Sequence, residues 1–138
     1  MSNEVCTEGL QAMLESYFTG EQSSPVNFYM GLCTDASIAE GAGLTDLTEV
    51  TGSGYARQTV PSDTNGFTSA STGTGDWKVT TSTETFSATG TWTGATHAFL
   101  ATTNDNSGKL IAVAELSTTR TLQNGDSLQV SMELTLAG

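Results

Sequence analysis

Residues 127–136 alternate strictly between polar and apolar side chains, and this pattern restricts the fold more than any other feature of the chain. The apolar set is Leu128, Val130, Met132, Leu134 and Leu136. Because successive side chains of a strand point to opposite faces, the alternation predicts one strand with a buried face and a wet face. Such a strand is typical of an antiparallel sheet that covers a core on one side.

Further short strands are predicted upstream, separated by residues typical of turns and loops. We expect them over 26–33, within 49–60 around Tyr55, Arg57 and Thr59, and over 76–82, 84–88, 97–102 and 109–116. The Asn104–Gly108 segment between the last two indicates a hairpin turn. Residues 110–114 carry no polar side chain, which predicts a central strand covered on both faces. Residues 61–75, rich in Ser, Thr and Gly, are predicted to be either a long surface loop or an edge strand.

The beginning of the chain has the periodicity of a helix rather than a strand. Apolar residues recur there at spacings of three and four: Cys6, Leu10, Met13, Leu14, Tyr17 and Phe18. We predict a helix over 4–19, capped by Ser2 or Asn3 and ended by Gly20. Its apolar stripe must be covered, and we favour the interpretation that it closes one face or end of the domain's own sheet. The alternative is that the stripe faces a partner.

About seven short strands and one helix predict a mainly β fold, an antiparallel β-sandwich or jelly roll with one N-terminal α-helix. The 138 residues are the length of one domain. We assign residues 1–25 to the helix and its connector and residues 26–138 to the β-sandwich, as parts of a single compact domain.

The charge of the chain argues against two classes of partner. Fifteen acidic and four basic side chains give a net charge of −11, and the cations are scattered, so we expect no nucleic-acid partner. The longest apolar run is 110–114, far below the roughly 20 residues that cross a bilayer. The first 20 residues lack Lys and Arg, unlike a secretion signal, so we expect synthesis in the cytoplasm. We therefore expect Cys6 and Cys33 to be free buried thiols, with a disulfide as the less favoured alternative.

Candidate catalytic and metal-binding residues are few. His97 is the only histidine and heads an apolar run, which favours a structural strand residue over a catalytic base. No Gly-x-Ser-x-Gly motif is present, and carboxylates such as Asp46 and Glu49 lie in a polar, solvated stretch. The Asn104-x-Asn106-x-Gly108 spacing faintly resembles a calcium loop but lacks the glutamate at its twelfth position. We therefore expect no enzymatic activity, no cofactor and no metal ion.

Three motifs in the second part of the chain share their order with a known protein family. The first is 46–58, DLTEVTGSGYARQ; the second is the Trp-led segment 76–80; the third comprises 97–101, 107–112 and 122–128. Together, over residues 44–138, they resemble the small β-rich virion proteins of tailed bacteriophages, which include capsid decoration, head-fibre and tail-fibre-like proteins. Members often have Gly-Gly where this chain has Ser107-Gly108, and the helix is not part of the resemblance.

The resemblance implies a non-enzymatic virion structural protein made in the host cytoplasm. We expect a homo-oligomer, with a trimer as the expected state, that binds the outside of the major capsid protein lattice as a decoration or cement protein. Two alternatives stay open: a tail, baseplate or fibre component, and a carbohydrate-binding module that stacks sugars on exposed aromatic rings. Within the Gly-Tyr-Ala-Arg segment, we expect Arg57 to pair with a carboxylate such as Glu49 while Tyr55 packs inward. The expected contact residues toward other protomers or the capsid are Trp77, Lys78 and Trp92.

Overall fold

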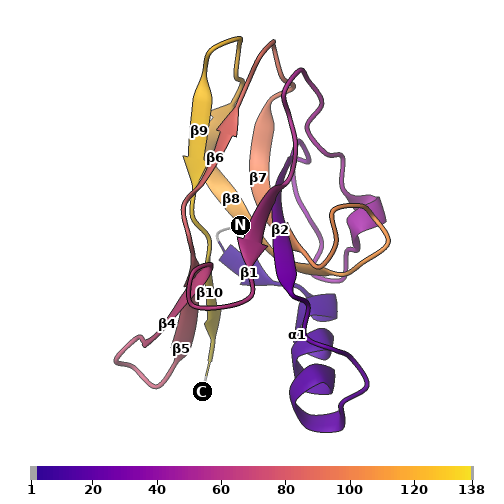
Figure 1. Cartoon of the computed structure of the whole chain (residues 1–138), viewed down its shortest axis with the longest axis vertical. Helices are drawn as coiled ribbons and strands as arrows, with labels where there is room; N and C mark the ends of the chain where they lie inside the picture. The colour runs from indigo at the N-terminus through magenta and orange to yellow at the C-terminus, as the bar shows by residue number, and fades with distance from the viewer. Residues whose placement is uncertain (1–2, 138) are drawn as a thin grey trace.

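The computed structural model describes residues 3–137 and is mainly β, with a single N-terminal α-helix (Figure 1). The strands are β1 (Asn3–Val5), β2 (Asn27–Cys33), β3 (Gln58–Pro61), β4 (Phe67–Ser71), β5 (Trp77–Thr81), β6 (Glu84–Ser87), β7 (Ala95–Ala101), β8 (Leu110–Arg120), β9 (Ser127–Val130) and β10 (Glu133–Leu136). The helical elements are α1 (Thr7–Leu14), the π-helix η1 (Glu15–Thr19) and the 3-10 helix η2 (Leu44–Asp46). These elements confirm the predicted fold class.

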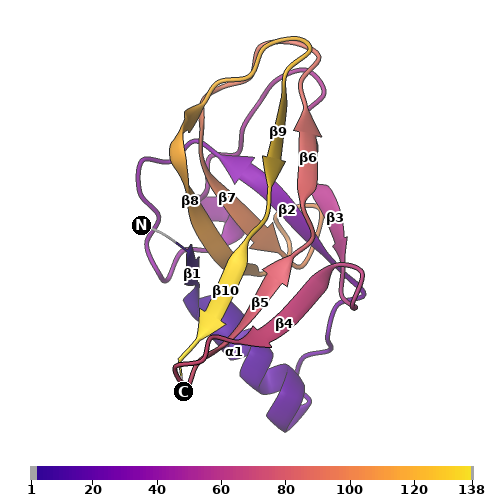
Figure 2. The same ribbon diagram turned by 90° about the vertical axis from the view of Figure 1, so that its left-hand side faces the viewer.

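The strands form three antiparallel sheets, which are arranged in two facing layers as in a sandwich (Figures 1 and 2). One layer is a five-stranded sheet in the order β1-β8-β7-β2-β3, and the facing strands form the β10-β5-β4 and β6-β9 sheets. The main core lies between the layers, where Met30 and Leu100 from the five-stranded sheet belong to one buried cluster with Phe86, Val130 and Leu134 from the facing strands.

A second apolar cluster covers the other face of the five-stranded sheet. Cys33, Phe99 and Val113 lie in it together with Ile38 and Leu44 from the loop that follows β2. Residues 110–114 are therefore buried on both faces, as their composition predicted. The same cluster buries Gly31 and Cys33 of β2, and for Cys33 this agrees with the expectation of a buried thiol.

The alternating segment keeps its predicted burial but is not one strand. Val130, Met132 and Leu134 are buried, while residue 128 is half-buried and residue 136 is exposed. The segment divides because β9 pairs with β6 and β10 pairs with β5. Thr81 occupies the break, where its hydroxyl accepts a hydrogen bond from the Met132 N–H at 2.9 Å and its own N–H donates to the Met132 carbonyl at 2.8 Å.

The predicted start of the helix is wrong by three residues. Asn3–Val5 form β1, which pairs with the outer edge of β8, and α1 begins only at Thr7. Cys6 joins the two elements, since its N–H donates to the Ile111 carbonyl at 2.8 Å. The end at Gly20 is confirmed, with a left-handed φ of 70°. Of the two predicted caps, Asn3 lies in β1 and Ser2 lies outside the described residues.

Two predictions for the middle of the chain are refined by the structure. Of residues 49–60 only 58–60 belong to a strand, β3, because the chain turns at Gly52 and Gly54, which both have positive φ. Of the two alternatives for 61–75, the edge strand is confirmed, since β4 lies at the margin of its sheet. Among residues 3–137, the structure contains no helix with the length and apolar character needed to cross a bilayer.

Candidate functional site

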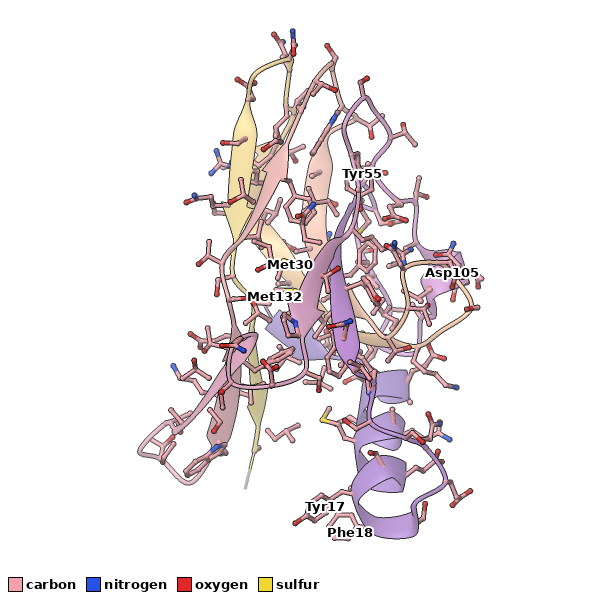
Figure 3. All side chains as sticks on the ribbon, viewed as in Figure 1. Tyr17, Phe18, Met30, Tyr55, Asp105 and Met132 are labelled. Carbon is pink, nitrogen blue, oxygen red and sulfur yellow. The ribbon has the colours of Figure 1, made fainter. Side chains whose placement is uncertain are left out.

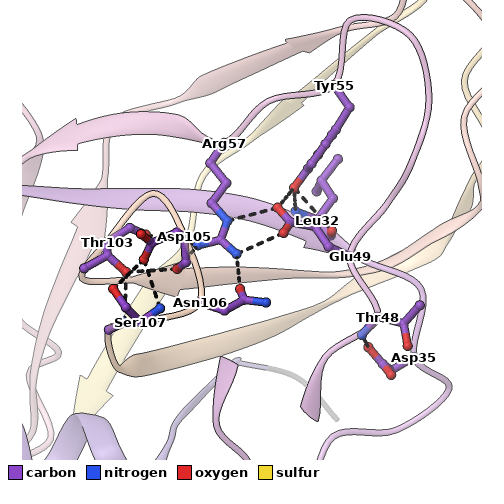
Figure 4. Close-up of polar contacts among 11 residues, drawn as sticks. Leu32, Asp35, Thr48, Glu49, Tyr55, Arg57, Thr103, Asp105, Asn106 and Ser107 are labelled. Carbon is purple, nitrogen blue, oxygen red and sulfur yellow. Dashed lines mark hydrogen bonds and ion pairs between the residues drawn. The ribbon is translucent and has the colours of Figure 1, made fainter. Parts of the chain in front are cut away.

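The Gly-Tyr-Ala-Arg segment forms a partly buried polar network around Glu49 (Figure 4). The Arg57 guanidinium donates to both carboxylate oxygens of Glu49, at 3.0 and 2.9 Å. The Tyr55 hydroxyl donates to the same carboxylate at 2.5 Å and accepts a hydrogen bond from the Leu32 N–H at 2.9 Å. Burial, followed by the bond to Glu49, raises the pKa of the Tyr55 hydroxyl far above its usual range. The predicted Arg57–Glu49 pairing is therefore confirmed, and Tyr55 packs inward as expected.

Arg57 also holds the hairpin turn between β7 and β8. Its guanidinium donates to the carbonyls of Thr103 and Asp105, at 3.0 and 2.7 Å, and to the Asn106 side-chain oxygen at 2.7 Å. It lies 5.0 Å from the centre of the Phe99 ring, within the range of a cation–π contact. One side chain thus connects two segments that are 46 to 49 residues apart in sequence, and the role of the motif is structural.

The same contacts explain the faint calcium-like spacing at Asn104–Gly108. The side-chain oxygen of Asn106, which would face a cation in such a loop, accepts a hydrogen bond from the Arg57 guanidinium instead. Ser107 donates to the Asp105 carboxylate through its hydroxyl and its N–H, and these bonds lower the pKa of Asp105. The segment is a turn, as predicted.

His97 lies in β7 with only 1% of its surface exposed. Its Nδ1 is 2.9 Å from the Thr96 hydroxyl, and its Nε2 is 3.7 Å from a carboxylate oxygen of Glu115. The Thr96 hydroxyl in turn donates to the Asp35 carbonyl at 2.5 Å. The imidazole is therefore buried against the sheet, in agreement with the interpretation of His97 as a structural strand residue.

Both cysteines are buried and free, and within residues 3–137 no three metal-ligating side chains converge. Burial raises the pKa of the Cys6 thiol to about 11 and that of the Cys33 thiol to about 12. Both are therefore neutral thiols near pH 7.

The three residues expected to contact other molecules lie in different environments. Trp77 is 57% exposed on β5, and its neighbour Lys78 points to the opposite face of the strand, 3.5 Å from Glu133. Trp92 is 2% exposed, because the turn at 52–54 covers it and its indole N–H donates to the Ser53 carbonyl at 2.7 Å. Its ring packs edge-on against Tyr55. Of the three, only Trp77 presents an aromatic surface, and neither Trp92 nor Tyr55 offers an open face to a sugar.

An apolar groove opens where the two layers of the sandwich part, and sequence reasoning did not find it. It has a volume of about 1180 Å³. Its floor continues the main core with Phe28, Leu100 and Ile111, and its two walls are the helical segment α1–η1 and the inner face of the β10-β5-β4 sheet. Figure 1 shows these walls as two separate projections below the body of the sandwich. The only charged residues among those that line the groove are Asp63 and Lys109.

The helical wall corrects the interpretation of the N-terminal apolar stripe. The first turns do cover the domain's own sheet, since Cys6 and Gly9 are buried against β8. Further along, Leu14, Tyr17 and Phe18 are 58%, 84% and 74% exposed. Tyr17 and Phe18 lie together at the far end of η1, with ring centres 5.1 Å apart (Figure 3). The apolar stripe thus extends beyond the sheet that it was expected to cover.

The sheet wall of the groove is also apolar, and it too continues beyond the core. Register places Val79 beside Leu134 and Trp77 beside Leu136, so these side chains share one face. Burial declines along that face, from Leu134 at 8% exposed to Leu136 at 45% and Trp77 at 57%. The apolar face therefore extends beyond the core that it covers. The alternation at 127–136 was the signal for it, but alternation does not show where the covering layer ends.

Comparison with known proteins gives one family. The model of the family described as "Podophage GP4 fiber I protein gp80" matches residues 5–136, which include the helix, both layers of the sandwich and the groove. A search of curated proteins finds no match.

Proposed function

Because the chain belongs to the podophage GP4 fiber I protein gp80 family, a family of phage virion structural proteins, we propose that it is a subunit of a fibre on a podophage virion. The observation that carries this proposal is the extent of the match, from residue 5 to residue 136. We had expected a capsid decoration protein, with a tail, baseplate or fibre component as an alternative, and the family description favours the fibre component.

The organisation of the chain supports a structural role. Its best-formed polar cluster, around Arg57, has a structural role, because it connects the turn between β7 and β8 to the rest of the fold. Its lone histidine and both cysteines are buried. A fibre subunit needs a rigid body and surfaces for its neighbours, and the exposed apolar residues of this chain are concentrated at the groove end, with Tyr17, Phe18 and Trp77 among them.

The test is the location of the chain in purified virions. We expect cryo-electron microscopy of particles, with an antibody fragment bound to the protein, to show label on a fibre. Quantitative mass spectrometry should give far fewer copies of this chain than of the major capsid protein. Label spread over the capsid lattice, with a copy number comparable to that of the major capsid protein, would instead establish the decoration role and overturn the fibre proposal.

A further inference from the structure

We infer that the outer edge of β4 is a self-association site, at which β4 of a second copy of the chain pairs with it in an antiparallel, two-fold arrangement. This inference rests on the proposed function, since it names the partner at the groove end of the same fibre subunit. It differs from the trimer that the resemblance implied.

The hydrogen bonds at the two ends of β4 show which backbone groups face outward. Ser82 N–H donates to the Gly66 carbonyl at 2.7 Å, and Thr72 N–H donates to the Asp76 carbonyl at 3.1 Å. Bonded and non-bonded pairs alternate in an antiparallel ladder, so residues 68 and 70 also bond to β5. The backbone groups of residues 67, 69 and 71 therefore point away from β5.

Most of these outward groups have no partner strand among the described residues. The Phe67 N–H is used locally, since it donates to the Asp63 carbonyl at 3.0 Å. The N–H and carbonyl of Ser69, and those of Ser71, lie along an edge where the sheet ends. Figure 2 shows β4 at the margin of the β10-β5-β4 sheet with no strand beyond it. The edge offers the donors and acceptors that an added strand requires.

Nothing in the sequence protects this edge, in contrast to the margins at β1, β3 and β10; the margin at β9 (Ser127–Val130) is also without a charge or a proline. Natural edge strands commonly carry charges or proline, which block pairing with other chains. β1 carries Glu4, β3 ends at Pro61 and β10 carries Glu133. Residues 64–75, which contain β4, have neither a charge nor a proline. A strand edge left open in this way favours pairing.

The charge distribution limits where a second copy can bind. With a net charge of −11, two copies repel each other over much of their surface. The uncharged stretch of residues 64–75 lets two copies approach without facing carboxylates. Because the same edge is open in every copy, it can meet itself, and no second complementary surface is needed.

The outward groups are spaced for this pairing. Centred on Ser69, an antiparallel pair lets the two Ser69 residues exchange both of their N–H···O bonds. The Ser71 N–H of each copy then meets the Phe67 carbonyl of the other, which is the outward group of Phe67 that remains available. The two three-stranded sheets become one continuous sheet, with the apolar faces that carry Trp77 on the same side.

Two substitutions at one residue test the inference in different ways. Ser69→Lys places two ammonium groups directly opposite each other in the pair, where like charges destabilise a sheet. Ser69→Pro removes the outward N–H, which the chain itself does not use, so the monomer should tolerate it. The control is Ser127→Lys, an exposed serine of β9 that receives the same charge.

Sedimentation velocity on the purified full chain gives the readout. We expect the parent protein and Ser127→Lys to sediment as dimers, and both Ser69 variants to sediment as monomers with unchanged circular dichroism. A monomeric parent, a three-fold assembly, or a dimer that survives both Ser69 substitutions would overturn the inference. Failure of the proposed function would be seen in a different experiment. In that case the label would lie on the capsid of the virion, while the parent protein would still be a dimer in solution and the Ser69 variants would still be monomers.

Discussion

Arg57 binds Glu49 through two parallel hydrogen bonds, and the Arg57 side chain is only 5% exposed. Bidentate pairs of this kind are stronger than single-contact ion pairs and fix the geometry of both partners. Arg57 directly precedes β3, and Glu49 forms an isolated β-bridge with Cys33 at the end of β2, so the pair connects these two parts of the chain. The same guanidinium also binds the β7–β8 turn.

Glu49→Gln should therefore lower the free energy of unfolding by much more than a substitution of an exposed carboxylate does. The substitution leaves a buried guanidinium without its anion, and we expect a loss of about 3 kcal/mol, the lower end of the range for breaking a buried pair because Glu49 is partly exposed. Glu133→Gln is the control, since it breaks the exposed pair with Lys78 and should cost under about 1 kcal/mol. Urea denaturation of both variants measures the difference, and equal losses would contradict the structural role of the pair.

Leu134 and Leu136 test where the core ends. They lie on the same face of β10, but Leu134 is 8% exposed and Leu136 is 45% exposed. Leu134→Ala should cost roughly 2 to 5 kcal/mol as a core truncation. Leu136→Ala should cost under about 1 kcal/mol, since much of that side chain is already in water. A comparable loss in free energy of unfolding for both would show that the groove is closed in the folded protein.

Local patterns predicted the elements whose burial is decided by their own sequence. The β7–β8 hairpin, β2, β5 and β6 were found with ends that differ by at most four residues. Alternation, apolar runs and turn residues indicated β2 and the hairpin, and the β propensity of threonine indicated β5 and β6. β1 was missed because nothing in Asn3–Val5 signals a strand, and the edge of β8 supplies its hydrogen bonds. The break at Ser131 was hidden, since burial continues to alternate across it.

The candidate site could be predicted only in part. The Arg57–Glu49 pair was within reach because both residues belong to one short segment. The groove was not, because its floor and walls come from strands and a helix that are distant in sequence. Periodicity shows which side of α1–η1 is apolar, but whether Tyr17 is covered depends on how far the sheet beneath it extends. Trp77 and Trp92 likewise look alike in the sequence, and only the fold exposes one and buries the other.

Gly9 sets the distance between α1 and the sheet. A Cβ at this position would overlap the backbone carbonyl of Ile111 in β8. Gly9→Ala must therefore push the helix away, and we expect a cost of about 1 to 3 kcal/mol, as for overpacking of a core, despite the better helix propensity of alanine. Gly41→Ala is the matched control, since a Cβ there meets nothing within 4 Å and its φ is not positive. Thermal unfolding should separate the two variants, and a stabilised Gly9→Ala would show that α1 does not pack closely on β8.

The two cysteines predict how the protein responds to thiol reagents and to alkaline pH. Burial raises the pKa of Cys6 to about 11 and that of Cys33 to about 12, from an ordinary value of 9.0. The thiolate is the reactive form, so neither residue should react with Ellman's reagent at pH 8 until the chain unfolds. In urea above the unfolding transition, both should react.

The same shifts fix the sign of the pH dependence of stability. Because the unfolded thiols ionise near 9.0 and the folded thiols only near 11 and 12, the unfolded state loses protons first as the pH rises. Stability should be unaffected by these groups below pH 9 and should fall as the pH rises from there toward 12. A Cys6→Ala, Cys33→Ala variant is the control, and its unfolding free energy should fall less steeply over this range. A parallel decline in both proteins, or rapid labelling of the folded chain at pH 8, would show that the thiols are accessible and ionise normally.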